Sequence, residues 1–75
     1  MNKINFINLI NSYLNRIIIN DYNSCAYVSK ILINDYLNSC INSTDLKEVN
    51  RLKDLILDVL ANSYGIFLNI PEITL

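Results

Sequence analysis

The chain has 75 residues, enough for one small domain, and a domain of this size buries only about 60% of the surface that its unfolded chain exposes. Hydrophobic residues make up 52% of the sequence, and six basic against seven acidic side chains give a net charge of −1. The basic residues are scattered and form no stripe, which argues against nucleic-acid binding, and two cysteines without any histidine cannot supply the four ligands of a structural zinc site.

The first predicted element is an amphipathic helix over about residues 3–19. At 100° per residue its large apolar side chains fall in one half of the circumference, opposite asparagine, serine and arginine. The apolar half contains Phe6, Ile7, Leu9, Ile10, Tyr13, Leu14, Ile17 and Ile18. A strand over residues 16–19 is the competing interpretation, because that run is β-branched.

A second helix is predicted over about residues 24–42, after a polar break at residues 20–24, with Ser24 or Asn23 as its N-cap. Its core side is expected to contain Cys25, Ala26, Val28, Leu32, Ile33, Tyr36, Leu37 and Cys40. Its opposite, outward side is expected to contain Tyr27, Ile31, Asn34, Asp35 and Asn38.

A third helix is predicted over about residues 45–64. Asp45 with Glu48 has the spacing of a capping box, although Ser43 or Thr44 could be the cap instead, and Gly65 fits the position that follows a helix end. Its apolar arc spans about 200°, wide enough to contact both other helices. This arc contains Leu46, Val49, Leu52, Leu55, Ile56, Leu57, Val59 and Leu60, with Lys53 inside it, where its stem would run along apolar surface.

Residues 66–75 are expected to form an irregular or extended C-terminal tail, because Pro71 forbids a continuous helix. We expect the tail to fold back over the bundle, with Phe67 and Leu68 covering an open end; the alternative is an arm that docks on another chain. Short links place neighbouring helices antiparallel, so the predicted fold is a single all-α domain, 1–75, built as a three-helix antiparallel bundle.

A five-residue pattern recurs in the chain: Leu or Ile first, any residue second, Asn third, Asp or Ser fourth and Tyr fifth. It occurs within residues 9–14, 18–23, 32–37 and 60–65. Repeat proteins have a fixed period, whereas these segments start 9, 14 and 28 residues apart. Compositional bias explains the pattern better than duplication, which stays the alternative.

No catalytic, cofactor or metal site is predicted. A chain without histidine lacks the side chain that titrates near neutral pH, and Asp54 with Asp58 reads as a solvated helix face. Cys25 and Cys40 are 15 positions apart on one predicted helix, about 22 Å, too far for a disulfide, so both are expected to be reduced core residues.

No stretch reaches the roughly 18 apolar residues of a membrane span, and asparagines interrupt the apolar start of the chain, so neither a span nor a signal peptide is expected. These features favour a cytoplasmic protein.

Protein binding is the function class that the sequence favours. Tyr27, Ile31 and Asp35 are four residues apart and share the outward side of the second helix, with Asp21 and Tyr22 in the loop before it. Aromatic side chains supply much of the free energy of protein interfaces, so these five residues are the predicted partner-binding site. The alternative is that Tyr27 and Ile31 only cover the tail.

The leading hypothesis is a small intracellular inhibitor, of the immunity-protein or antitoxin type, that occludes a cognate toxin. The alternative is a structural homo-oligomer, or a small subunit of a larger assembly, in which the broad apolar arcs pair between chains. The apolar excess in so short a chain favours an interface in either case.

Overall fold

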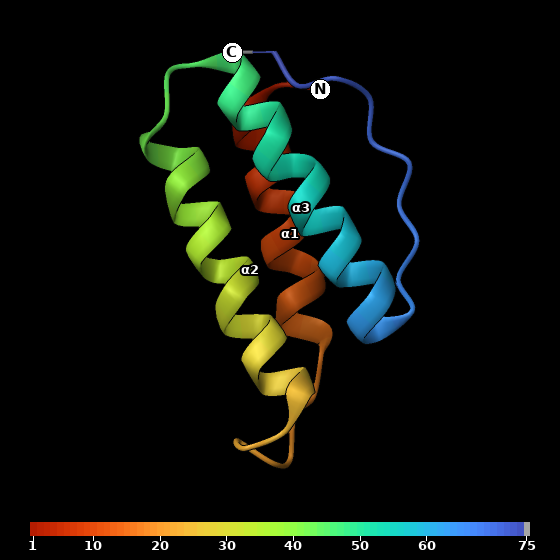
Figure 1. Cartoon of the computed structure of the whole chain (residues 1–75). Helices are drawn as coiled ribbons and strands as arrows, with labels where there is room; N and C mark the ends of the chain where they lie inside the picture. Colours follow the sequence, from red (N-terminus) through yellow and green to blue (C-terminus); the bar gives the residue numbers. More distant parts are fainter. Residues whose placement is uncertain (75) are drawn as a thin grey trace.

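The computed structural model describes residues 1–74, and Leu75, the last residue of the predicted tail, lies outside the described part. Three α-helices, α1 (Lys3–Arg16), α2 (Cys25–Asn42) and α3 (Leu46–Tyr64), run antiparallel to their neighbours in a bundle (Figure 1). The predicted all-α, three-helix bundle is therefore confirmed.

The predicted end of the first helix at residue 19 is wrong by three residues. Helix α1 ends at Arg16, and Ile17 is extended, with its amide donating to the Leu14 carbonyl at 3.2 Å. β-Branched residues are poor helix formers, and at Ile18, whose side chain lies in solvent, no packing offsets that low propensity. Ile17 packs on the core from an extended backbone. The competing strand does not form either, since residues 17–19 are irregular.

The predicted signals at the start of α2 and the end of α3 are confirmed. The Ser24 hydroxyl accepts a hydrogen bond from the Tyr27 amide at 3.2 Å, as an N-cap does. Gly65 has a φ of 65°, the left-handed conformation that glycine adopts without a steric penalty, and its amide bonds the Ala61 carbonyl at 3.1 Å.

Asp45 starts α3 as predicted, but within residues 1–74 neither hydrogen bond of the predicted capping box, between the Asp45 side chain and the Glu48 amide or the reverse, is formed. Asp45 is the N-cap, and its carboxylate accepts from the Lys47 amide at 3.0 Å. The Asp45 amide, however, donates to the Ser43 hydroxyl at 3.2 Å, while the Glu48 carboxylate accepts from Arg51 Nε at 2.9 Å. The hydrogen bonds from Arg51, helped by its positive charge, hold the pKa of the Glu48 carboxyl below its ordinary value.

The core is formed by apolar side chains from all three helices and the tail. Its buried members are Phe6, Ile7, Ile10, Leu14, Ile33, Leu37, Cys40, Val49, Leu52, Ile56, Leu60 and Ile73. Lys53 is buried beside them, and its ammonium reaches the Ile70 carbonyl at 3.5 Å and the Asp54 carboxylate at 3.6 Å. The expectation that its stem runs along apolar surface is confirmed.

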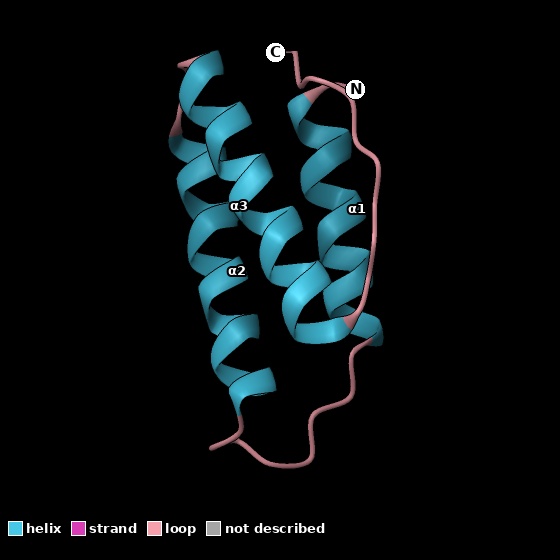
Figure 2. Ribbon diagram, turned by 45° about the vertical axis from the view of Figure 1, so that its right-hand side comes forward, coloured by secondary structure: helices cyan, strands magenta, loops and turns pink. Residues whose placement is uncertain are grey.

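The tail, residues 65–74, has no regular secondary structure and returns along the side of the bundle away from α2, beside α1 and α3 (Figure 2). Because an extended chain points successive side chains to opposite sides, Ile66, Leu68 and Ile70 pack on the core while Phe67 between them is 81% exposed. The tail thus packs on its own bundle. The prediction for Leu68 holds in part, and that for Phe67 is wrong.

Hydrogen bonds fasten the end of the tail at two places. The Asn50 side chain accepts from the Ile73 amide at 2.8 Å and donates to the Ile73 carbonyl at 3.1 Å. Beside it, the Thr74 amide donates to the Met1 carbonyl and the Lys3 amide donates to the Thr74 carbonyl, each at 3.0 Å. Both chain ends therefore meet at the same end of the bundle (Figure 1).

Candidate protein-binding surface

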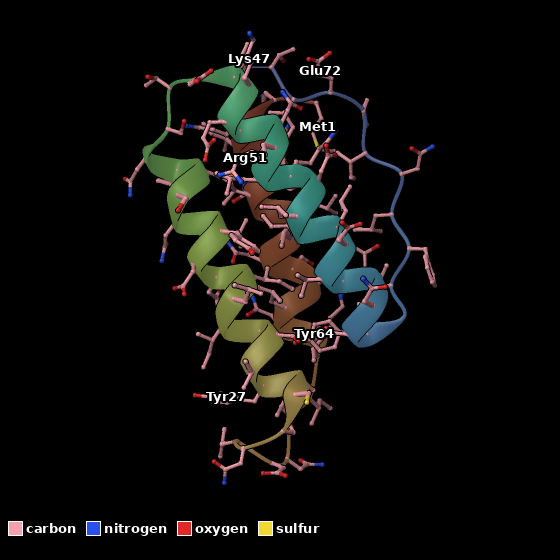
Figure 3. The ribbon with its side chains drawn as sticks, in the orientation of Figure 1. Met1, Tyr27, Lys47, Arg51, Tyr64 and Glu72 are labelled. Atoms are coloured by element: carbon pink, nitrogen blue, oxygen red, sulfur yellow. The ribbon has the colours of Figure 1, made fainter. Side chains whose placement is uncertain are left out.

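The predicted site residues on α2 lie on its outward side. Tyr27 is half-buried, Ile31 and Asp35 are exposed, and the three follow one another at intervals of about one turn. Figure 3 shows Tyr27 projecting from α2 away from the bundle. The tail runs along the opposite side (Figure 2), so the alternative that Tyr27 and Ile31 cover the tail is wrong.

The loop before α2 joins this surface through an aromatic pair. The rings of Tyr22 and Tyr27 lie edge to face, with centroids 5.2 Å apart and planes at 82°, the arrangement that the charge distribution of aromatic rings favours. The Asp21 carboxylate accepts from the Asn23 amide at 2.9 Å and shapes the turn. Tyr22 itself remains 71% exposed. The structure thus brings the loop residues and Tyr27 together at one end of α2.

Two apolar residues that sequence reasoning placed in the core belong to the outer surface instead. Val28 is 60% exposed and Leu32 is 39% exposed, and Cys25 is exposed as well, so their predicted core positions are wrong. The buried residues of α2 are Ile33, Leu37 and Cys40, which follow one another at intervals of about one turn. Apolar residues occur around most of the circumference of α2, and there are more of them than one core-facing side can accommodate. This surplus in the sequence is the signal that some of them lie on the outer surface.

These residues make one continuous patch, with apolar side chains flanked by a carboxylate. We call it the α2 outer surface, and it consists of Tyr22, Tyr27, Val28, Ile31, Leu32 and Asp35. Within residues 1–74 the side chain of Asp35 makes no hydrogen bond and no ion pair. The two ion pairs of that part of the chain both lie on α3. Its carboxylate is therefore free to meet a cation from outside.

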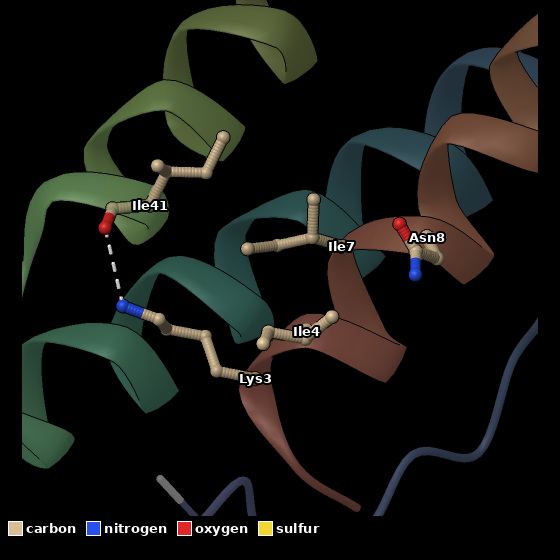
Figure 4. A pocket seen from close by; sticks show the side chains of 5 residues that line it. All are labelled: Lys3, Ile4, Ile7, Asn8 and Ile41. Atoms are coloured by element: carbon tan, nitrogen blue, oxygen red, sulfur yellow. Dashed lines mark hydrogen bonds between the residues drawn. The ribbon is translucent and has the colours of Figure 1, made fainter.

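A second apolar feature lies between the start of α1 and the end of α2. It is a groove of about 370 Å³ lined by Lys3, Ile4, Ile7, Asn8 and Ile41 (Figure 4). The Lys3 ammonium donates to the carbonyls of Ile41 at 3.2 Å and Ser43 at 2.9 Å, where it completes the C-terminus of α2. Because that charge is turned toward the helix end, the groove itself offers mainly isoleucine side chains.

The polar chemistry of the described residues is limited. Cys25 and Cys40 are both free thiols, and burial raises the pKa of the Cys40 thiol. Residues 1–74 contain no group of three or more His, Cys, Asp or Glu side chains placed to hold a metal ion. Among the same residues no helix has both the length and the hydropathy needed to cross a bilayer.

Comparison of the chain with protein-family models, curated proteins and solved structures finds no match.

Proposed function

We propose that the protein acts by binding another protein through the α2 outer surface. The observation that carries this proposal is the exposure of four large apolar side chains, Tyr22, Val28, Ile31 and Leu32, next to the unpaired carboxylate of Asp35. Contiguous exposed apolar area beside polar groups is typical of protein interfaces, whose centres are rich in aromatic residues. Burying such area removes it from water at a gain of about 25 cal/mol per Å².

Within this class, the leading candidate is an inhibitor of the immunity-protein or antitoxin type that occludes the active site of a cognate toxin. Its support is the small helical fold and the tyrosine rings and Asp35 carboxylate of the α2 outer surface, with the exposed Asp21 in the loop beside it. Such a surface suits a partner whose active site is lined with basic side chains, because opposite charges steer association and select partners.

The test is affinity purification with the full chain from cells of its source. The wild-type protein should recover one stoichiometric partner, and the double variant Tyr27→Ala/Asp35→Ala should lose it while remaining folded, with a melting temperature lowered only by the lost ring contact between Tyr22 and Tyr27. The matched control, Phe67→Ala/Asp58→Ala, removes an exposed aromatic and an exposed carboxylate elsewhere and should bind like the wild type. Unchanged recovery with the first variant would refute the assigned surface. A recovered partner whose toxicity or catalysis the chain does not block would refute the inhibitor.

A homo-oligomer is the second candidate, and the apolar groove on α1 and α2 favours it. Ile4 and Ile41 are exposed there, and pairing of two grooves would cover both side chains. Light scattering decides between the candidates: a dimer that Ile4→Asp dissociates supports the oligomer, whereas a monomer at all concentrations excludes it.

A further inference from the structure

The exposed side of α2 carries a regular seam. Cys25, Val28, Leu32, Asp35 and Ser39 are all exposed and are separated by three, four, three and four residues. This alternation is the spacing of the positions that one helix presents to another in a coiled coil. We call these five residues the heptad stripe. It spans about 21 Å along the helix axis, the length of four turns of a facing helix.

A carboxylate directly follows the apolar part of the heptad stripe. Asp35 lies one turn from Leu32, and no residue within 1–74 pairs with it. Burial of an unpaired charge in an interface is strongly unfavourable, whereas a charge buried with an opposite charge is tolerated and fixes the alignment of the two helices. An occupant of the stripe therefore has to bring a cation to Asp35.

A second copy of this chain cannot bring one through the same stripe, because none of its five positions is basic. Parallel pairing of two stripes would set Asp35 against Asp35. Antiparallel pairing centred on Leu32 would set Asp35 against Val28. The first arrangement opposes like charges and the second buries a carboxylate against an aliphatic side chain, so self-association through this stripe is disfavoured.

We propose that the heptad stripe receives an amphipathic helix of a different protein, with apolar residues at alternating three- and four-residue spacing and a lysine or arginine opposite Asp35. This inference rests on the proposed function, and it adds the structure and the charge of the segment that binds. Such a helix packs nearly parallel or antiparallel to α2, with its side chains between those of Val28 and Leu32.

The test uses a displayed library of helical peptides with randomised positions on one side, selected against the full chain. Wild-type protein should enrich peptides with the three–four apolar spacing and a basic residue at one fixed position. Against Asp35→Lys, the basic residue should be replaced by an acidic one. Synthetic peptides from the wild-type selection should bind Asp35→Lys at least tenfold more weakly by fluorescence anisotropy, and a charge-reversed peptide should restore the affinity. The control Asp58→Lys, an exposed position on α3, should bind like the wild type.

Three results would overturn the inference: enriched peptides without a helical period, equal binding of the same peptides to wild type and Asp35→Lys, or no enrichment above that of a Leu32→Asp variant. Circular dichroism confirms that the variants fold, which is expected since both positions are exposed. If the selection fails while Tyr27→Ala/Asp35→Ala still loses its partner, the helical partner is refuted and the proposed function stands. If the peptides bind as expected but the natural partner is unaffected by that variant, the proposed function is refuted instead.

Discussion

Replacing Asn50 by alanine should loosen the end of the tail and lower the stability of the whole domain. The side chain makes two hydrogen bonds with the backbone of Ile73, whose own side chain is 1% exposed. Each such bond contributes about 1 kcal/mol, whereas the third bond of this side chain, from its amide to the Leu46 carbonyl at 3.0 Å, is exposed and is replaced by a bond to water in the variant. Alanine in place of asparagine inside a helix returns about 0.6 kcal/mol. The expected net loss is about 1.5 kcal/mol, which for a domain of this size lowers the melting temperature by roughly 6–12 °C.

Calorimetry or thermal circular dichroism measures this shift, and amide hydrogen exchange at Ile73 shows whether the tail opens first. The matched control is Asn62→Ala, an exposed asparagine of the same helix that makes no side-chain hydrogen bond within residues 1–74. The control gains helix propensity and should be equally or slightly more stable than the wild type. If Asn50→Ala also melted at or above the wild-type temperature, the two hydrogen bonds to Ile73 would not hold the tail.

Three further predictions follow from buried and capping side chains. Leu52→Asp should unfold the domain, as circular dichroism would show, because it buries an unpaired charge. The control Leu46→Asp, in the exposed first turn of α3, should leave the domain folded. A folded Leu52→Asp variant would contradict the described core. Burial raises the pKa of the Cys40 thiol above its ordinary 9.0, so as pH rises the unfolded chain loses that proton before the folded chain does. The free energy of unfolding should therefore fall as pH rises past about 9, and Cys40→Ala should remove this part of the pH dependence. In the folded protein, iodoacetamide at pH 8 should modify the exposed Cys25 but not the buried Cys40. Lys3→Met should cost about 1 kcal/mol, seen as a melting temperature lower by roughly 4–8 °C, because the α2 C-terminus loses its donor; an unchanged value would mean that water replaces the lysine.

The outer residues of α2 show how far a helical period can predict a binding surface. The spacing alone predicts that Tyr27, Ile31 and Asp35 share the outward side of α2, and they lie on that side. It also predicts that Val28 and Leu32 face the core, yet both are exposed. Where apolar residues surround most of a helix, periodicity limits the choices without selecting one, and the packing of the neighbouring helices determines which side is covered.

The amino-acid sequence by itself determined the number of helices, most of their ends and their antiparallel order. These features depend on short-range physics: side-chain caps at Ser24 and Asp45, the left-handed conformation of Gly65 and the short link of residues 43–45 between α2 and α3. Each involves residues within a few positions of one another, and their signals are therefore legible in the chain.

Only the tertiary structure decided how the chain closes and which surface remains open. Asn50 binds Ile73 across 23 positions and Lys3 binds Ser43 across 40, contacts that no local pattern announces. They depend on where the tail and the helix ends arrive after the core has packed. For the same reason the tail covers the side beside α1 and α3 (Figure 2). Tyr22 of the loop, together with Val28, Leu32 and Asp35 of α2, is left facing solvent.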